Sequence, residues 1–246
     1  MEVLGNTGFK VSRLCIGTDY ADVYGGSSLG RDILLKGFSL GVNFWDSSES
    51  YGSYPAIRGA LKVLDRSDIV ITSKSYSRDR DGAEKDLDDA LHEIGTDYLD
   101  IFMLHAVDTL EDFKVRRDVL EFLLRVKREG LIRAVGVSTH SANLALALAE
   151  VPEIEVVLTV LNMRAIDIRE GDLELMHSAV KRLYEAGKGV YLMKVLGRGK
   201  LADYVEEALG YAFKIPYVHA VSVGIRSKKE VETAVKVEKE VDNTQY

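Results

Sequence analysis

Residues 68–105 read DIVITSKSYSRDRDGAEKDLDDALHEIGTDYLDIFMLH. The two ends of this stretch, 68–75 and 98–105, are short and rich in β-branched, aromatic and aliphatic side chains, as strands buried on both faces require. Between them, 83–95 has apolar residues at helical spacing and stops at Gly95, a common termination signal. The order strand, helix, strand predicts a βαβ unit with parallel strands and a right-handed crossover.

The same alternation recurs from one end of the chain to the other. Eight apolar runs are expected to form strands, at 11–18, 41–48, 68–75, 98–105, 132–139, 155–162, 189–196 and 219–226. Helical patterns separate them, including one long stretch over 109–130, and the last opens with Ser227 and Glu230 at capping-box spacing. Eight such units in 246 residues favour a closed barrel over an open doubly wound sheet. The sequence therefore predicts the α/β class, with a single (β/α)8 (TIM) barrel domain over 1–246 and an N-terminal β-hairpin closing the barrel floor.

Composition limits the partners and the compartment. The chain has 32 Lys and Arg against 39 Asp and Glu, a net charge of −7, so bulk electrostatics attract neither nucleic acid nor an anionic membrane. Its one cysteine, Cys15, excludes an intrachain disulfide and suits a reducing compartment. No signal-peptide pattern and no apolar run of transmembrane length is present in the sequence, so we expect a cytoplasmic protein. The oligomeric state is left open.

Polar residues interrupt the apolar runs where the expected strands end. In a barrel of this kind the carboxyl ends of the strands form the active site, and Asp46, Lys74 and His105 end three adjacent strands. Buried charges are costly unless paired, so Asp46 and Lys74 are expected to neutralise one another. An ammonium group beside Tyr51, five residues after Asp46, would lower the phenol pKa and make it a usable proton donor. This constellation suits carbonyl reduction, with no metal site expected.

Taken in order, these segments resemble the aldo-keto reductases, (β/α)8-barrel enzymes that use NADPH. The resemblance covers nearly the whole chain and runs through LGNTGFKVSRLCIGT (4–18), NFWDSSESYG (43–52), VITSK (70–74), YLDIFMLHAVD (98–108), GLIRAVGVSTH (130–140), VLN (160–162), GVYLMKVLGRGKL (189–201) and VSVGIRSKKEV (221–231). The sequence ends without the longer C-terminal extension that often lines the substrate pocket in that family, so the resemblance is to a short form.

The resemblance implies specific roles. Tyr51 would be the general acid, Lys74 held by Asp46 would lower its pKa, and His105 would position the carbonyl of a small substrate. The implied cofactor is NADPH, with NADH as the alternative. The implied cofactor-binding residues are Gly17 and Thr18 by the nicotinamide ribose, Ser138 and Asn162 at the carboxamide, Lys194 at the end of the seventh strand, Gly197, Arg198 and Gly199 at the pyrophosphate, and Arg226, Ser227 and Lys228 at the 2′-phosphate. Physical reasoning also favours an anion site at Arg226, Ser227 and Lys228, because two cations and a serine lie at the N-terminus of a predicted helix.

The chain departs from the family pattern at four positions. Val195 stands where a proline usually follows the Met-Lys of the seventh strand. Leu161 stands where an aromatic residue usually stacks on the nicotinamide, and Thr233 and Ala234 stand where Glu and Asn are common near the adenosine.

Two other functions remain open. A Schiff-base lyase could use Lys74 or Lys194 as the nucleophile, although an ion-paired Lys74 would be a poor one. A nucleotide-sensing or partner-binding barrel with little turnover could have kept the same site.

Overall fold

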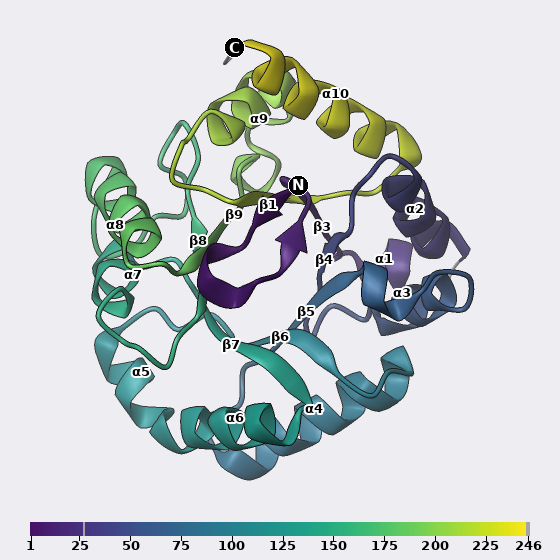
Figure 1. Ribbon diagram of the computed structural model, residues 1–246. Coiled ribbons are helices and arrows are strands. Elements are labelled where there is room, and N and C mark those ends of the chain that lie inside the picture. The colour runs from purple at the N-terminus through teal and green to yellow at the C-terminus, as the bar shows by residue number, and fades with distance from the viewer. Residues whose placement is uncertain (27, 245–246) are drawn as a thin grey trace.

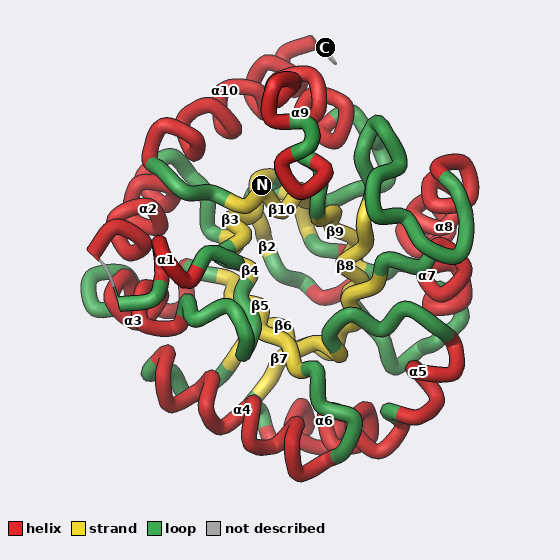
Figure 2. Tube along the Cα trace, turned by 180° about the vertical axis from the view of Figure 1, so that it is seen from behind, coloured by secondary structure: helices red, strands yellow, loops and turns green. Residues whose placement is uncertain are grey.

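Eight parallel strands close into a barrel in a computed structural model, which describes residues 1–26 and 28–244. Helices surround the barrel on its outer side (Figures 1 and 2). The strands are β3 (Leu14–Gly17), β4 (Phe44–Asp46), β5 (Val70–Ser75), β6 (Leu99–Leu104), β7 (Ile132–Thr139), β8 (Val156–Val160), β9 (Gly189–Met193) and β10 (Ala220–Gly224). Each lies within one of the eight predicted strands, and β10 pairs with β3 to close the ring. The predicted (β/α)8 barrel is therefore confirmed.

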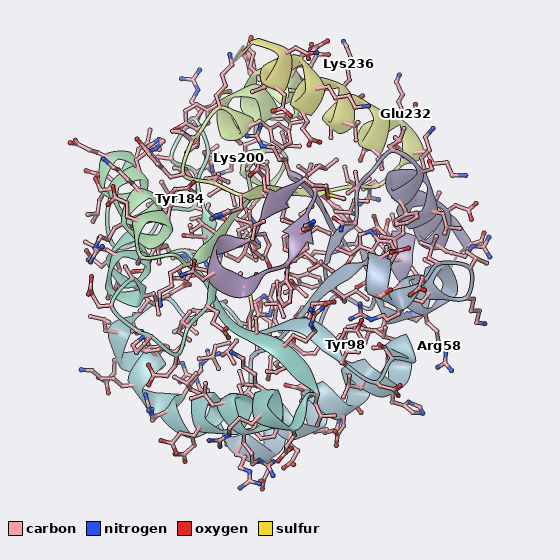
Figure 3. All side chains as sticks on the ribbon, viewed as in Figure 1. Arg58, Tyr98, Tyr184, Lys200, Glu232 and Lys236 are labelled. Atoms are coloured by element: carbon pink, nitrogen blue, oxygen red, sulfur yellow. The ribbon has the colours of Figure 1, made fainter. Side chains whose placement is uncertain are left out.

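The helices follow the strands in the predicted alternation. They are α1 (Ala21–Tyr24), α2 (Ser28–Ser39), α3 (Tyr54–Leu61), α4 (Arg80–Ile94), α5 (Leu110–Val115), α6 (Arg117–Glu129), α7 (Ala142–Leu148), α8 (Leu173–Glu185), α9 (Val205–Phe213) and α10 (Lys228–Thr244). Figure 3 shows Glu232 and Lys236 of α10 pointing away from the barrel. No helix within the described ranges has the length and apolar character needed to cross a membrane.

The prediction of a single helix over 109–130 is wrong, because the helix is interrupted at Arg116. Its backbone (φ −87°, ψ 22°) is not helical. The buried guanidinium of Arg116 donates to the His105 carbonyl oxygen at 2.9 Å and pairs with Asp112 at 2.8 Å. This contact with the end of β6 separates α5 from α6.

The predicted N-terminal hairpin is present and covers the amino end of the barrel. Strands β1 (Glu2–Val3) and β2 (Lys10–Val11) are antiparallel, and in Figure 1 they lie across the barrel centre. Three hairpin side chains are fully or almost fully buried and join the inner barrel cluster: Leu4, Phe9 and Val11. The turn between the strands is anchored to the barrel by a 2.9 Å hydrogen bond from the Asn6 amide to the Gly187 carbonyl oxygen.

Strand alternation separates an outer apolar layer from the barrel interior. Trp45 packs in the cluster between strands and helices, whereas the neighbouring Asp46 is paired with Lys74 and Tyr191 inside the barrel. The buried Asp46 is thereby delivered to the carboxyl end of β4, where the mouth of the barrel opens.

Candidate active site

Asp46 and Lys74 form the predicted ion pair at the carboxyl ends of β4 and β5. Lys74 Nζ donates to Asp46 Oδ1 at 2.7 Å and to the Ser47 carbonyl oxygen at 2.6 Å. The Lys74 side chain is fully buried and that of Asp46 is 5% exposed. A pair this deeply buried is stable only when its remaining hydrogen-bonding capacity is satisfied, and the Asp46 carboxylate has a second partner.

That second partner is Tyr191 of β9, which the sequence prediction missed. Its hydroxyl donates to Asp46 Oδ2 at 2.7 Å, and its side chain is fully buried. Burial, together with the Asp46 charge, raises the pKa of Tyr191 well above its usual value. Tyr191 is therefore a neutral donor that fixes the orientation of Asp46. The available signal was a hydroxyl-bearing residue at an alternate position of an otherwise aliphatic strand.

Tyr51 follows β4 and lies beside the ion pair. Lys74 Nζ is 4.7 Å from the centre of the Tyr51 ring, and the His105 ring centre is 5.8 Å from it. Among the residues that the structure describes, none forms a hydrogen bond with the Tyr51 hydroxyl. The arrangement brings the four predicted catalytic residues Asp46, Tyr51, Lys74 and His105 into one cluster.

The expected lowering of the Tyr51 pKa is not found. Burial raises this pKa above the usual value for tyrosine, and the negative charge of Asp46 raises it further. The physical reason is that Asp46 neutralises the Lys74 ammonium, so the phenol gains little from the cation while losing contact with water. Tyr51 is consequently a protonated phenol at neutral pH.

His105 is held on one side by polar groups of the β4–α3 loop. Its Nδ1 atom lies 2.9 Å from Ser48 Oγ and 3.6 Å from Glu49 Oε2. Tyr76 stacks on the imidazole with 3.8 Å between ring centres, and its amide donates to Glu49 Oε1 at 2.8 Å. Burial lowers the pKa of His105, against an opposing contribution from Glu49. Nδ1 is thus engaged, which leaves Nε2 as the nitrogen able to contact a substrate.

The residues expected to hold a nicotinamide cofactor lie at or just beyond strand ends on the same mouth, and Figure 2 shows the loops of this face around the barrel opening. Gly17 ends β3, and the Thr18 hydroxyl donates to the Asp46 carbonyl oxygen at 2.9 Å. Ser138 Oγ accepts the Ala106 amide at 2.8 Å. The Asn162 carboxamide donates to the Ile166 carbonyl oxygen and accepts the Ile166 amide, and it also donates to the Lys194 carbonyl oxygen at 3.2 Å.

The loop after β9 has an unusual backbone. Lys194, Gly197, Arg198 and Gly199 all have positive φ, at 55°, 56°, 57° and 88°. A side chain at Gly199 would meet no atom within 4 Å, so this side of the turn is open. Two positive-φ residues that are not glycine cost conformational energy, and such strain concentrates at functional sites.

The cations expected at the 2′-phosphate sit at the start of α10. Ser227 Oγ accepts the Glu230 amide at 3.3 Å, as a capping box requires. Arg226 is paired with Asp22 at 2.6 Å, and Lys228 with Asp32 at 3.4 Å. Exposed ion pairs of this kind contribute little stability, so an anionic ligand could displace the carboxylates.

Several functional candidates besides Tyr191 escaped the sequence prediction. They are Ser48, Glu49 and Tyr76 around His105, and Asp108 beside His140. Asp108 comes three residues after His105, so its place just beyond a predicted strand end could have marked it as a candidate site residue. Tyr76 carried no such signal, because its ring reaches His105 only through the packing of two loops.

Together, a closed parallel barrel and a cluster of a carboxylate, an ammonium, a phenol and an imidazole at its carboxyl end define a barrel enzyme of acid–base type. The profile of the Aldo/keto reductase family matches residues 27–214. The chain belongs to the aldo/keto reductase family, a family of nicotinamide-dependent oxidoreductases.

Similar proteins agree with this assignment. The chain is 29% identical over 154 residues to an L-galactose dehydrogenase of Arabidopsis thaliana, covering 56% of this chain and 48% of the relative. It is 28% identical over 187 residues to an NAD/NADP-dependent indole-3-acetaldehyde reductase of Schizosaccharomyces pombe, covering 73% and 60%. The chain thus spans less than two thirds of either relative. A solved aldo-keto reductase structure from Pseudomonas aeruginosa has the same fold, with a TM-score of 0.81 at 22% identity over 97% of this chain and 93% of that one.

Proposed function

We propose that this protein reduces the carbonyl group of small aldehydes or ketones, using NADPH or NADH, with Tyr51 as the proton donor. The observation that carries the proposal is the position of Tyr51, whose ring lies 4.7 Å from the Lys74 ammonium and 5.8 Å from the His105 ring. A phenol, a cation and an imidazole placed together at a barrel mouth can receive a carbonyl oxygen and protonate it.

Each side chain has a distinct part in this reaction. Tyr51 is protonated, so it can donate to the oxyanion that forms from the carbonyl. Lys74 gives the phenolate left behind only a partial stabilisation, because Asp46 offsets part of the ammonium charge while fixing the ammonium in position. His105 is held at Nδ1 by Ser48, so Nε2 orients the carbonyl oxygen. In the reverse direction Tyr51 would accept the proton of an alcohol, which agrees with a dehydrogenase being among the relatives.

The residues of this chain fit a nicotinamide dinucleotide, which when bound supplies the hydride. A phosphate-bearing ligand needs cations and amide donors, and the mouth offers both at the start of α10 and in the open turn after β9. The residues that would hold it are Gly17, Thr18, Ser138, Asn162, Lys194, Gly197, Arg198, Gly199, Arg226, Ser227 and Lys228. Arg226 and Lys228 would favour the additional phosphate of NADPH over NADH.

The test is a pair of titrations with NADPH and NADH, followed by turnover of a panel of small aldehydes and ketones. We expect Tyr51→Phe to reduce kcat by about 100-fold or more while the cofactor Kd is unchanged. Tyr76→Phe is the matched control, because Tyr76 also contacts His105 but does so through its ring. Full activity in Tyr51→Phe would overturn the mechanism. Cofactor binding without turnover of any carbonyl would instead support a nucleotide-sensing barrel.

A further inference from the structure

A second line of polar side chains crosses the barrel mouth outside the Asp46 cluster. Asp108 follows β6, His140 follows β7 and Lys194 follows β9. His140 Nδ1 lies 3.0 Å from Asp108 Oδ1, and His140 Nε2 is in contact with Lys194 Nζ. The order carboxylate, imidazole, amine is that of a catalytic triad with lysine in the nucleophile position.

Asp108 is held firmly enough to set the state of the imidazole. Its Oδ1 atom also accepts the backbone amide of His140 at 2.7 Å, and Oδ2 is paired with Arg169. A carboxylate can only accept hydrogen bonds, so the proton of the neutral imidazole lies on Nδ1. The lone pair of Nε2 then faces Lys194, where it can receive a proton.

Lys194 differs from Lys74 in the ways that matter for nucleophilic chemistry. The Lys194 side chain is 24% exposed, so small molecules can reach Nζ, whereas Lys74 is fully buried and donates to two oxygens. Partial burial lowers the pKa of Lys194, and the nearby Arg198 and Arg169 cations lower it further. The Asp167 carboxylate, 3.8 Å from Nζ, and Asp108 oppose this shift, but the pKa is lowered overall. A lysine that loses its proton readily beside an oriented base is an activated amine.

We propose that, in the cofactor-free protein, Lys194 adds covalently to small anionic aldehydes and forms an imine, with His140 as the base and Asp108 as its positioning residue. This reaction is separate from the proposed reduction at Tyr51. The Lys194 ammonium first gives one proton to His140 Nε2, and the amine nitrogen then attacks the carbonyl carbon. The nitrogen passes a proton to the oxygen to give a carbinolamine. His140 returns its proton to that hydroxyl, which leaves as water, so the product is a protonated imine and His140 is neutral again.

The preference for an anionic aldehyde follows from the neighbouring charges. Arg198 and Arg169 both border the Lys194 environment, each with a half-exposed side chain, and their partners are Asp167 and Asp108. A carboxylate or phosphate on the aldehyde can pair with these guanidinium groups, for which their planar donor geometry is suited.

The experiment measures adduct formation in the full chain without any nicotinamide cofactor. Pyridoxal 5′-phosphate and pyridoxal are the two probes, because they share one aldehyde and differ by the phosphate. Imine absorbance gives the rate, and borohydride reduction followed by peptide mass mapping gives the position. We expect the adduct at Lys194, faster with the phosphorylated probe, and lost in Lys194→Arg. Lys200→Arg is the control, since Lys200 is an exposed lysine of the same loop region (Figure 3).

Two further variants test the role of His140 as the base. With two variants, the test still stands if one of them fails to fold. His140→Gln should slow adduct formation by about 100-fold, and Asp108→Asn should slow it because an amide no longer fixes the imidazole tautomer. Labelling spread evenly over exposed lysines, unchanged rates in both folded variants, or equal rates with the two probes would overturn the inference. Because no cofactor and no turnover is involved, failure here would leave the role of Tyr51 untouched.

Discussion

The hydroxyl of Tyr191 donates a 2.7 Å hydrogen bond to Asp46 Oδ2, joining β9 to β4 inside the barrel. The two residues are 145 positions apart in the chain and both are buried. Since Lys74 occupies Oδ1, the carboxylate is held at both oxygens. The position of the Lys74 ammonium therefore depends on a strand far from it in the sequence.

Replacing Tyr191 by Phe should destabilise the protein. The ring still packs on Phe44, at 4.9 Å between centres, but the carboxylate loses a donor. A hydrogen bond to a charged group contributes about 1.5–3 kcal/mol, so we expect the free energy of unfolding in urea to fall by that amount. Tyr54→Phe is the control, because its 2.7 Å bond to Ser73 joins two neutral hydroxyls and should cost about 1 kcal/mol. Equal losses would show that the Asp46 charge adds nothing.

Replacing Glu49 by Gln should shift the titration of His105 to lower pH. Burial lowers the pKa of His105 and the Glu49 carboxylate raises it, so removing the carboxylate charge takes away the larger of the two opposing contributions and leaves only that of Asp46. The shift can be followed by NMR of the imidazole carbon-bound protons against pH. Glu121→Gln, at an exposed position of α6, should leave the titration unchanged. A shift of the His105 titration to higher pH in Glu49→Gln would contradict the contact between Glu49 and His105.

The turn of the N-terminal hairpin gives a prediction with a built-in control. Gly5 has φ +52°, and a Cβ there would lie 2.3 Å from the Gly189 amide nitrogen, which is backbone and cannot yield easily. Gly5→Ala should therefore lower the free energy of unfolding by about 2–4 kcal/mol. Gly8 has φ +77° with nothing within 4 Å, so Gly8→Ala should cost only about 1 kcal/mol. If urea unfolding gave similar losses for Gly5→Ala and Gly8→Ala, the close contact between Gly5 and the Gly189 backbone would be contradicted.

Glu238 of α10 should make stability fall as the pH rises. Burial, with the Asp242 charge, raises its pKa to about 7. A carboxyl whose folded pKa lies above its unfolded value stabilises the fold fully at low pH, and this contribution is lost as the pH rises through about 7. Glu238→Gln, which stays neutral, should be more stable than the parent by about 1–2 kcal/mol at pH 8 and similar to it at pH 4.

Urea unfolding at the two pH values measures this difference. Glu232→Gln is the control on the same helix, because Glu232 points away from the barrel and pairs with Lys36 at the surface (Figure 3). Its effect should be small at both pH values. A gain for Glu238→Gln that is the same at pH 4 and pH 8 would contradict the raised pKa of Glu238.

The amino-acid sequence by itself determined the order of elements and the residues at strand ends. Short β-rich runs such as 98–105 and 132–139 can be buried on both faces only as strands of a parallel sheet, and eight of them in alternation with helices favour a closed barrel. The pairing of Asp46 with Lys74 was predictable too, because two charges at the ends of adjacent buried strands must neutralise one another.

Tertiary structure alone decided which distant groups meet and how they titrate. The contact of Tyr191 with Asp46 crosses the barrel interior, and the line from Asp108 through His140 to Lys194 joins three separate loops. The Tyr51 pKa was predicted in the wrong direction, because the sequence shows that a cation is near but not how far the phenol is removed from water. Distances across a closed barrel and the loss of solvent depend on packing of the whole chain, and neither is encoded in any local stretch.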